Sequence, residues 1–97
     1  MKRKRITLPK MSFVGLPIRT SYKIEQDIKT SKIPPLVKYY SHSSLPMRTP
    51  NRVRPGVFYS IYTDYVLGQD ISYTYFIGEQ VESVKNIPDP LKTLTIP

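Results

Sequence analysis

The sequence predicts an α+β fold in which a strand, a helix and two further strands follow one another and the strands form an antiparallel sheet. Two runs, 57–65 and 71–83, are dense in the β-branched and aromatic residues that are typical of strands. A short link with Gly and Asp separates them, which favours a β-hairpin. Ahead of the hairpin, Pro34 and Pro35 begin a segment with helical spacing. With 97 residues, the chain is expected to form a single domain.

The elements before the hairpin are one strand, one short turn and one helix. The first strand is expected over residues 6–19 with a bend at Gly15, because glycine weakens and bends strands. A short amphipathic turn is expected between Ser21 and Ser31. The helix is expected near residues 33–42, with Ser31 as its N-terminal cap.

The connections are rich in proline. MRTPNRVRPG, residues 47–56, is expected to be a long, mobile, basic loop between helix and hairpin. The tail from residue 86 leads through two prolines into the start of a further strand.

The register of the hairpin decides which side chains share a face. If Tyr65 lies opposite Tyr73, Thr63 lies opposite Tyr75, and Tyr62 lies opposite Phe76 on the other face. Both faces then carry large apolar groups, and the helix covers only one of them. The other face is expected to meet a ligand, a second copy of the chain or another protein.

Composition excludes several kinds of chemistry. The absence of cysteine excludes disulfides, thiolate nucleophiles and zinc sites with cysteine ligands. His42 is the only histidine and has no paired carboxylate nearby in the sequence, and no phosphate-binding glycine motif occurs. We therefore expect no enzymatic activity, no metal and no cofactor.

Charge is unevenly distributed along the chain. Residues 1–54 hold thirteen Lys or Arg against two acids, and residues 55–97 hold two against five, giving +11 and −3. The basic part indicates either a solvated surface or a nucleic-acid or acidic partner. The opening MKRKR is followed by a segment broken by prolines, which is not typical of a secretion signal, so a cytoplasmic protein without membrane contact is expected.

Tyrosines of the hairpin are the candidate ligand-binding residues. They form either an aromatic wall that attracts a cation through the ring quadrupoles or ordinary strand packing. An acid on the second strand is either the charge that meets a cationic ligand or solvated surface. The candidates are Tyr59, Tyr62, Tyr65, Tyr75 and Glu79.

Four short motifs carry a resemblance to a known family. The first strand ends in FVGLPIRTS, the helix begins KIP, the third element contains YTDY, and the last contains YTYFIGEQV. Together they resemble the first repeat of the GyrI-like effector-binding family, the sensor domain of many AraC-type transcription regulators. The matching residues are Val14, Gly15, Arg19, Thr20, Lys32, Ile33, Pro34, Tyr62, Asp64, Tyr65, Tyr73, Thr74, Gly78 and Val81.

The resemblance implies half of a duplicated fold whose two strand-helix-strand-strand units enclose a cleft for lipophilic, often cationic, small molecules. It assigns residues 1–86 to the first repeat and 87–97 to the start of the second. A homodimer or a partner chain is then expected to complete the fold. The acidic residue that relatives use against cations generally belongs to the second unit, and Val37 replaces a large aromatic of the family's helix.

Two other interpretations remain open at this point. No helix-turn-helix accompanies the unit, so direct DNA binding is not expected without an added domain. The alternatives to a ligand sensor are a basic protein that binds nucleic acid or an acidic partner, and a degenerate fragment without binding function.

Overall fold

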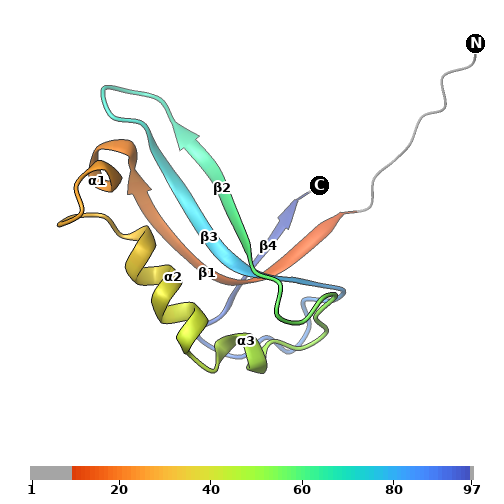
Figure 1. The fold of residues 1–97 in the computed structure, drawn as a ribbon. Coiled ribbons are helices and arrows are strands. Elements are labelled where there is room, and N and C mark those ends of the chain that lie inside the picture. The colour runs from red at the N-terminus through yellow and green to blue at the C-terminus, as the bar shows by residue number, and fades with distance from the viewer. Residues whose placement is uncertain (1–9, 97) are drawn as a thin grey trace, which may run out of the picture.

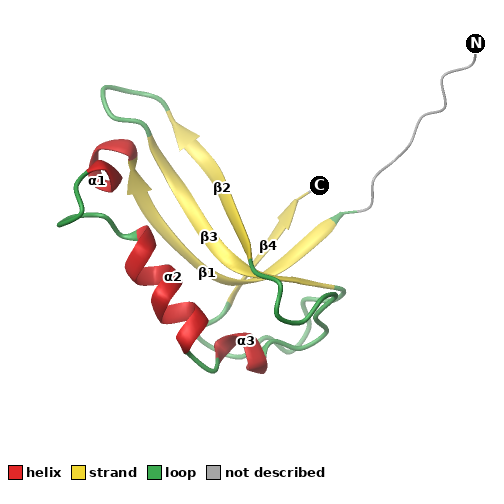
Figure 2. Ribbon diagram, in the orientation of Figure 1, coloured by secondary structure: helices red, strands yellow, loops and turns green. Residues whose placement is uncertain are grey.

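The computed structural model describes residues 10–96, which form a four-stranded antiparallel sheet with helices along one side (Figures 1 and 2). The elements are β1 (Met11–Ser21), α1 (Tyr22–Gln26), α2 (Ile33–His42), α3 (Leu45–Arg48), β2 (Tyr59–Val66), β3 (Ser72–Val81) and β4 (Lys92–Ile96). The strand order is β2-β3-β1-β4. This confirms the predicted α+β class. Residues 6–9 of the expected first strand and Pro97 lie outside the described part of the chain.

The face of the sheet that packs on α2 carries the main core. Because side chains alternate along a strand, Val14 of β1 and Ile77 of β3 point to this face, where Tyr40 of α2 meets them. The helix predicted at residues 33–42 is confirmed, and its two prolines lie in the first turn. The buried residues of this core are Val14, Tyr40, Leu45, Tyr73, Tyr75, Ile77, Val81 and Leu91.

The opposite face is apolar as well. Phe13 and Phe76 point away from the helices, and each is only 2% exposed. Tyr59 packs edge-on against Phe13, with ring centroids 5.4 Å apart. Figure 1 shows β1 bent in its middle with the helices on the outer side of the bend, so this second apolar cluster lies on the inner side.

Two glycines let β1 and β3 approach closely. Gly15 and Gly78 lie opposite each other in the register. A Cβ on Gly15 would lie 1.9 Å from the carbonyl oxygen of Ile77, and one on Gly78 would lie 2.3 Å from that of Val14. No side chain fits at either position, which explains the glycines of the FVG and FIG segments.

The hairpin register differs from the predicted one over most of its length. Val66 pairs with Ser72, in agreement with the predicted register, but Tyr62 pairs with Tyr75 rather than with Phe76. A β-bulge lies between the two pairs, where Asp64 has a φ of +55°. The extra residue shifts the register by one and moves Tyr62 to the helix side of the sheet.

The cap of α2 was predicted wrongly. Lys32 is the N-cap residue, and Ser31 instead donates to the carbonyl of Ile28. The carboxylate of Glu25 accepts the backbone N–H groups of Lys32 and Ile33, at 2.9 and 3.1 Å. An acid from the preceding helix thus satisfies two donors that a helix start leaves free.

The basic loop is more ordered than predicted. Its first two residues, Met47 and Arg48, are the end of α3, and its continuation is held to β3 by backbone hydrogen bonds from Val53 to Gln80 and from Glu82 to Asn51, both 2.9 Å long. No helix within residues 10–96 is long and apolar enough to cross a membrane.

Candidate ligand-binding surface

The five candidate residues lie in three different places. Tyr62, Tyr65 and Tyr75 gather on the helix side of the sheet, near the tip of the hairpin. Tyr59 lies on the opposite face beside Phe13. Glu79 lies at the far end of β3, buried beside Arg52. A single surface therefore contains three of the five.

Tyr62, Tyr65 and Tyr75 join two further rings to form what we call the tyrosine face. Tyr73 is its centre, because its ring lies 5.5 Å from Tyr22, 5.7 Å from Tyr62 and 5.4 Å from Tyr65. Tyr62 also packs edge-on against Tyr75 at 5.2 Å. The members of the tyrosine face are Tyr22, Tyr62, Tyr65, Tyr73 and Tyr75.

The tyrosine face has a buried base and an exposed rim. Tyr73 and Tyr75 are 4% and 1% exposed, whereas Tyr22, Tyr62 and Tyr65 are 47%, 50% and 49% exposed. Half-exposed rings that rest on buried rings form a preorganised aromatic surface, because the base fixes the rim without covering it. Such a surface offers ring faces and edges to a ligand at little cost in side-chain entropy.

The β-bulge makes the tyrosine face possible. Tyr62 and Tyr65 are three residues apart, so in a regular strand they would point to opposite faces. The extra residue at Asp64 turns Tyr65 to the same side, where both rings reach Tyr73. Aspartate tolerates the left-handed conformation better than most residues, which suits it to this position.

Arg19 fastens the bulge from β1. Its guanidinium donates to the carbonyl oxygen of Asp64 at 2.7 Å and to the hydroxyls of Thr74 and Ser72, both at 3.0 Å. These bonds tie three points on β2 and β3 to a residue of β1. The arginine of the FVGLPIRTS motif thereby positions the tyrosines without touching the tyrosine face.

The two buried phenols of the tyrosine face, Tyr73 and Tyr75, stay neutral at physiological pH. Burial raises the pKa of Tyr75 above its ordinary value, although the hydrogen bond with Ser60 opposes the shift. Burial, followed by the nearby charge of Glu25, raises the pKa of Tyr73. The base of the tyrosine face consequently consists of uncharged rings with an acid close to them.

The carboxylate near Tyr73 remains ionised. Burial alone would raise the pKa of Glu25, but hydrogen bonds from Thr20 and from the backbone of Lys32 and Ile33 hold it below its ordinary value. Glu25 therefore places a permanent negative charge near the central ring.

A polar hollow adjoins the tyrosine face. It has a volume of about 330 Å³, within the range of small-molecule sites. Tyr22 belongs to both the hollow and the tyrosine face, and the carboxylate of Asp70 accepts the backbone N–H of Lys23 at its wall. Two other hollows, of about 440 and 450 Å³, lie on the exposed side of α2 and share Pro35 and Lys38. The ammonium group of Lys38 disfavours a cation there.

Sequence reasoning missed three residues that build the tyrosine face. Tyr22 lies in a helix of five residues, and its backbone N–H donates to the carbonyl of Ile71, just ahead of β3, while its ring packs on Tyr73. Tyr73 was weighed with the other tyrosines but left out of the candidate set. Arg19 matched the family motif, yet its partners are more than 40 positions away, so no local pattern predicts them.

Comparison with known proteins identifies the family of the chain. The family model Cass2, described as integron-associated effector binding protein, matches residues 6–97. No curated protein and no solved structure matches the chain. The match covers nearly the whole sequence and confirms the resemblance to GyrI-like effector-binding domains. The chain belongs to the Cass2 family of integron-associated effector binding proteins.

Proposed function

We propose that this protein binds a lipophilic organic cation on the tyrosine face, as the recognition step of an effector-binding protein. Family membership supports an effector-binding, non-catalytic role in general terms. The observation that carries the finer proposal is the bulge at Asp64, which brings Tyr62 and Tyr65 together over Tyr73.

The chemistry of the tyrosine face favours a cation with apolar substituents. Each ring face carries the negative part of a quadrupole, and a cation over an exposed ring gains about 0.5–1 kcal/mol, rising to about 2 kcal/mol when it is desolvated. The ionised Glu25, close to the neutral ring of Tyr73, adds to the attraction. Apolar substituents on the cation pack against the half-exposed rings of Tyr62 and Tyr65.

A matched ligand pair tests the proposal. (3-Hydroxyphenyl)trimethylammonium and 3-tert-butylphenol have nearly the same shape, and only the first is charged. Titration calorimetry is expected to show tighter binding of the cation. Replacing Tyr62 or Tyr65 by leucine should weaken its binding by roughly 2- to 30-fold, the ratio that corresponds to one cation–π contact.

Tyr39 provides the control. It is 59% exposed on α2, away from the tyrosine face, so Tyr39→Leu removes an exposed tyrosine without touching the site. Equal losses for Tyr39→Leu and Tyr62→Leu, or equal affinity for the two ligands, would contradict the proposal.

We also propose that β4 opens a second repeat after a first one that ends near residue 86. β4 pairs with β1 along Met11–Gly15, which places it beside the central strand of the first unit. A second copy of the chain then lies on the face opposite the helices, where Tyr59, Ile61 and Leu94 are only half-buried. Leu94→Lys should shift a dimer toward monomer in analytical ultracentrifugation, and a monomeric parent protein at high concentration contradicts this part.

A further inference from the structure

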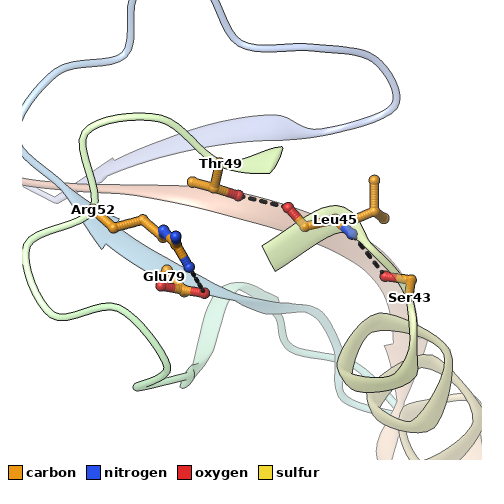
Figure 3. A network of polar contacts seen from close by, with 5 residues as sticks. All are labelled: Ser43, Leu45, Thr49, Arg52 and Glu79. Atoms are coloured by element: carbon orange, nitrogen blue, oxygen red, sulfur yellow. Dashed lines mark hydrogen bonds and ion pairs between the residues drawn. The ribbon is translucent and has the colours of Figure 1, made fainter. Parts of the chain in front are cut away.

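Residues 49–58, here called the strap, connect α3 to β2 and run beside the end of β3. Arg52 forms an antiparallel bridge with Val81, flanked by the two backbone hydrogen bonds that tie the strap to β3. At the start of the strap, the hydroxyl of Thr49 donates to the carbonyl of Leu45 in α3 (Figure 3). At its end, Phe58 packs edge-on against Tyr40, with centroids 5.2 Å apart.

The strap covers two polar groups that lack hydrogen bonds. The side chain of Glu79 has no exposed surface, and neither carboxylate oxygen has a partner with good hydrogen-bond geometry. Burial raises the pKa of Glu79, and the charge of Arg52 and the nearby backbone N–H of Gly56 oppose that shift without cancelling it. The hydroxyl of Tyr40 is equally buried and equally unpaired. Burial and the nearby charge of Glu79 raise the pKa of Tyr40 above its ordinary value, so the phenol keeps its proton. Two buried oxygens and one hydroxyl are thus available to a donor.

Arg52 is the cation that accompanies Glu79. Its Nη1 lies 3.7 Å from Oε1 of Glu79, within ion-pair range but beyond hydrogen-bond range (Figure 3). The side chain of Arg52 is 25% exposed, so its outer side remains in contact with solvent. A buried carboxylate is normally held by direct hydrogen bonds, and the long ion pair with Arg52 together with the nearby Gly56 N–H leaves Glu79 incompletely compensated.

We propose that the buried Glu79 and Tyr40 beneath the strap form a second, gated cation site, in which the Arg52 side chain occupies the place of a small guanidinium or ammonium ligand and is displaced by it. Such a ligand donates direct hydrogen bonds to the carboxylate of Glu79 and to the hydroxyl oxygen of Tyr40, which the arginine fails to do from its tethered position. Phe58 and the ring of Tyr40 supply aromatic walls for an apolar substituent. The site lies apart from the tyrosine face and does not depend on it.

The tether makes the site autoinhibited. A group held on the same chain competes with an effective concentration on the order of millimolar or above, so a free cation binds weakly to the unmodified protein. Removing the tethered cation should therefore strengthen binding. Binding also requires the strap to leave β3. This movement exposes two backbone amides: that of Val53, which now donates to Gln80 of β3, and that of Glu82, which now donates to Asn51 of the strap.

The test uses benzylguanidinium, with benzylurea as its uncharged analogue. Titration calorimetry is expected to show at least tenfold tighter binding of benzylguanidinium to Arg52→Gln than to the unmodified protein. Glu79→Gln and the double variant should bind at least tenfold more weakly than Arg52→Gln. Arg54→Gln, which removes an exposed arginine two positions away on the same strap, should bind like the unmodified protein.

A second measurement on the unmodified protein keeps the proposal testable if Arg52→Gln fails to fold. Saturation with benzylguanidinium should speed hydrogen exchange at the amides of Val53 and Glu82, and benzylurea should not. Equal affinities of Arg52→Gln and Arg54→Gln overturn the proposal. Binding that leaves both amides protected, or equal binding of benzylurea, overturns it as well.

Discussion

Replacing Gly15 by alanine tests the closest backbone approach in the sheet. The added Cβ would lie 1.9 Å from the carbonyl oxygen of Ile77 and 2.5 Å from the Cα of Gly78. An ordinary contact begins near 3.4 Å, so β1 and β3 must separate by about 1.5 Å at this point. Both neighbours are backbone atoms rather than flexible side-chain ends, so the sheet itself has to deform.

The cost follows from the hydrogen bonds that such a separation breaks. Paired strands are about 4.8 Å apart with N···O distances of about 2.9 Å, and 1.5 Å more puts flanking pairs beyond hydrogen-bond range. Two lost hydrogen bonds cost about 1 kcal/mol each, and the forced packing adds roughly 1 kcal/mol. We expect a loss of about 3 kcal/mol, which lowers the melting temperature of a chain of this size by roughly 12–24 °C.

Gly68→Ala is the matched control for this measurement. The nearest atom to its added Cβ is the carbonyl oxygen of Asp70 at 3.7 Å, an ordinary contact. Its stability should change by less than about 1 kcal/mol in either direction. Urea denaturation and thermal melting of both variants give the comparison. A Gly15→Ala variant within about 1 kcal/mol of Gly68→Ala would show that the strands do not approach so closely.

Three further predictions concern charged residues. Glu25→Gln should lower the free energy of unfolding at pH 7 by about 1 kcal/mol, because the acid caps α2. Its folded pKa is depressed, so this stabilisation is present above pH 4.5 and is lost as the pH falls further, and urea titrations at pH 7 and pH 3 should show the difference shrinking. For Glu79 the sign is opposite: burial raises its folded pKa despite the charge of Arg52, so ionisation destabilises the fold as the pH rises above 4.5. The stability of the parent protein should then fall relative to Glu79→Gln between pH 4.5 and pH 7, and a constant difference contradicts the assignment. Arg19→Gln should loosen the bulge, because it removes the hydrogen bond to the carbonyl of Asp64. Hydrogen exchange near Asp64 should then be faster, and ligand binding on the tyrosine face should be weaker. Unchanged exchange and unchanged binding would show that Arg19 does not position the tyrosines.

The elements that local chemistry controls were predictable from the sequence. Pro34 and Pro35 followed by apolar residues at helical spacing predicted α2 with the bounds that the structure shows. The density of β-branched and aromatic residues predicted both strands of the hairpin. In each case the signal lies within about ten residues, because helix starts and strand propensities are local properties.

The arrangement of the candidate site was less predictable. One bulge at Asp64 changes the sheet face of every β2 residue before it. An aspartate within a strand sequence does not by itself predict the positive φ that the bulge requires. The burial of Glu79 depends on a strap that is more than 20 positions away in the sequence. Acidic side chains are usually exposed to solvent, so the sequence alone predicts an exposed Glu79 where the structure has a buried one.

The strand order β2-β3-β1-β4 has a consequence for how the chain folds. β1 has no neighbour close to it in sequence, since Ser12 pairs with Val81 and Met11 pairs with Ile96. During synthesis the first strand leaves the ribosome about 50 or more residues before its partner is available, at a few to tens of residues per second. The hairpin of β2 and β3 therefore forms first, and the insertion of β1 is the slow step expected for pairings of long sequence separation. Until that step, the apolar residues of β1 stay exposed to solvent. Aggregation is therefore expected to compete with folding mainly before β1 has been inserted into the sheet.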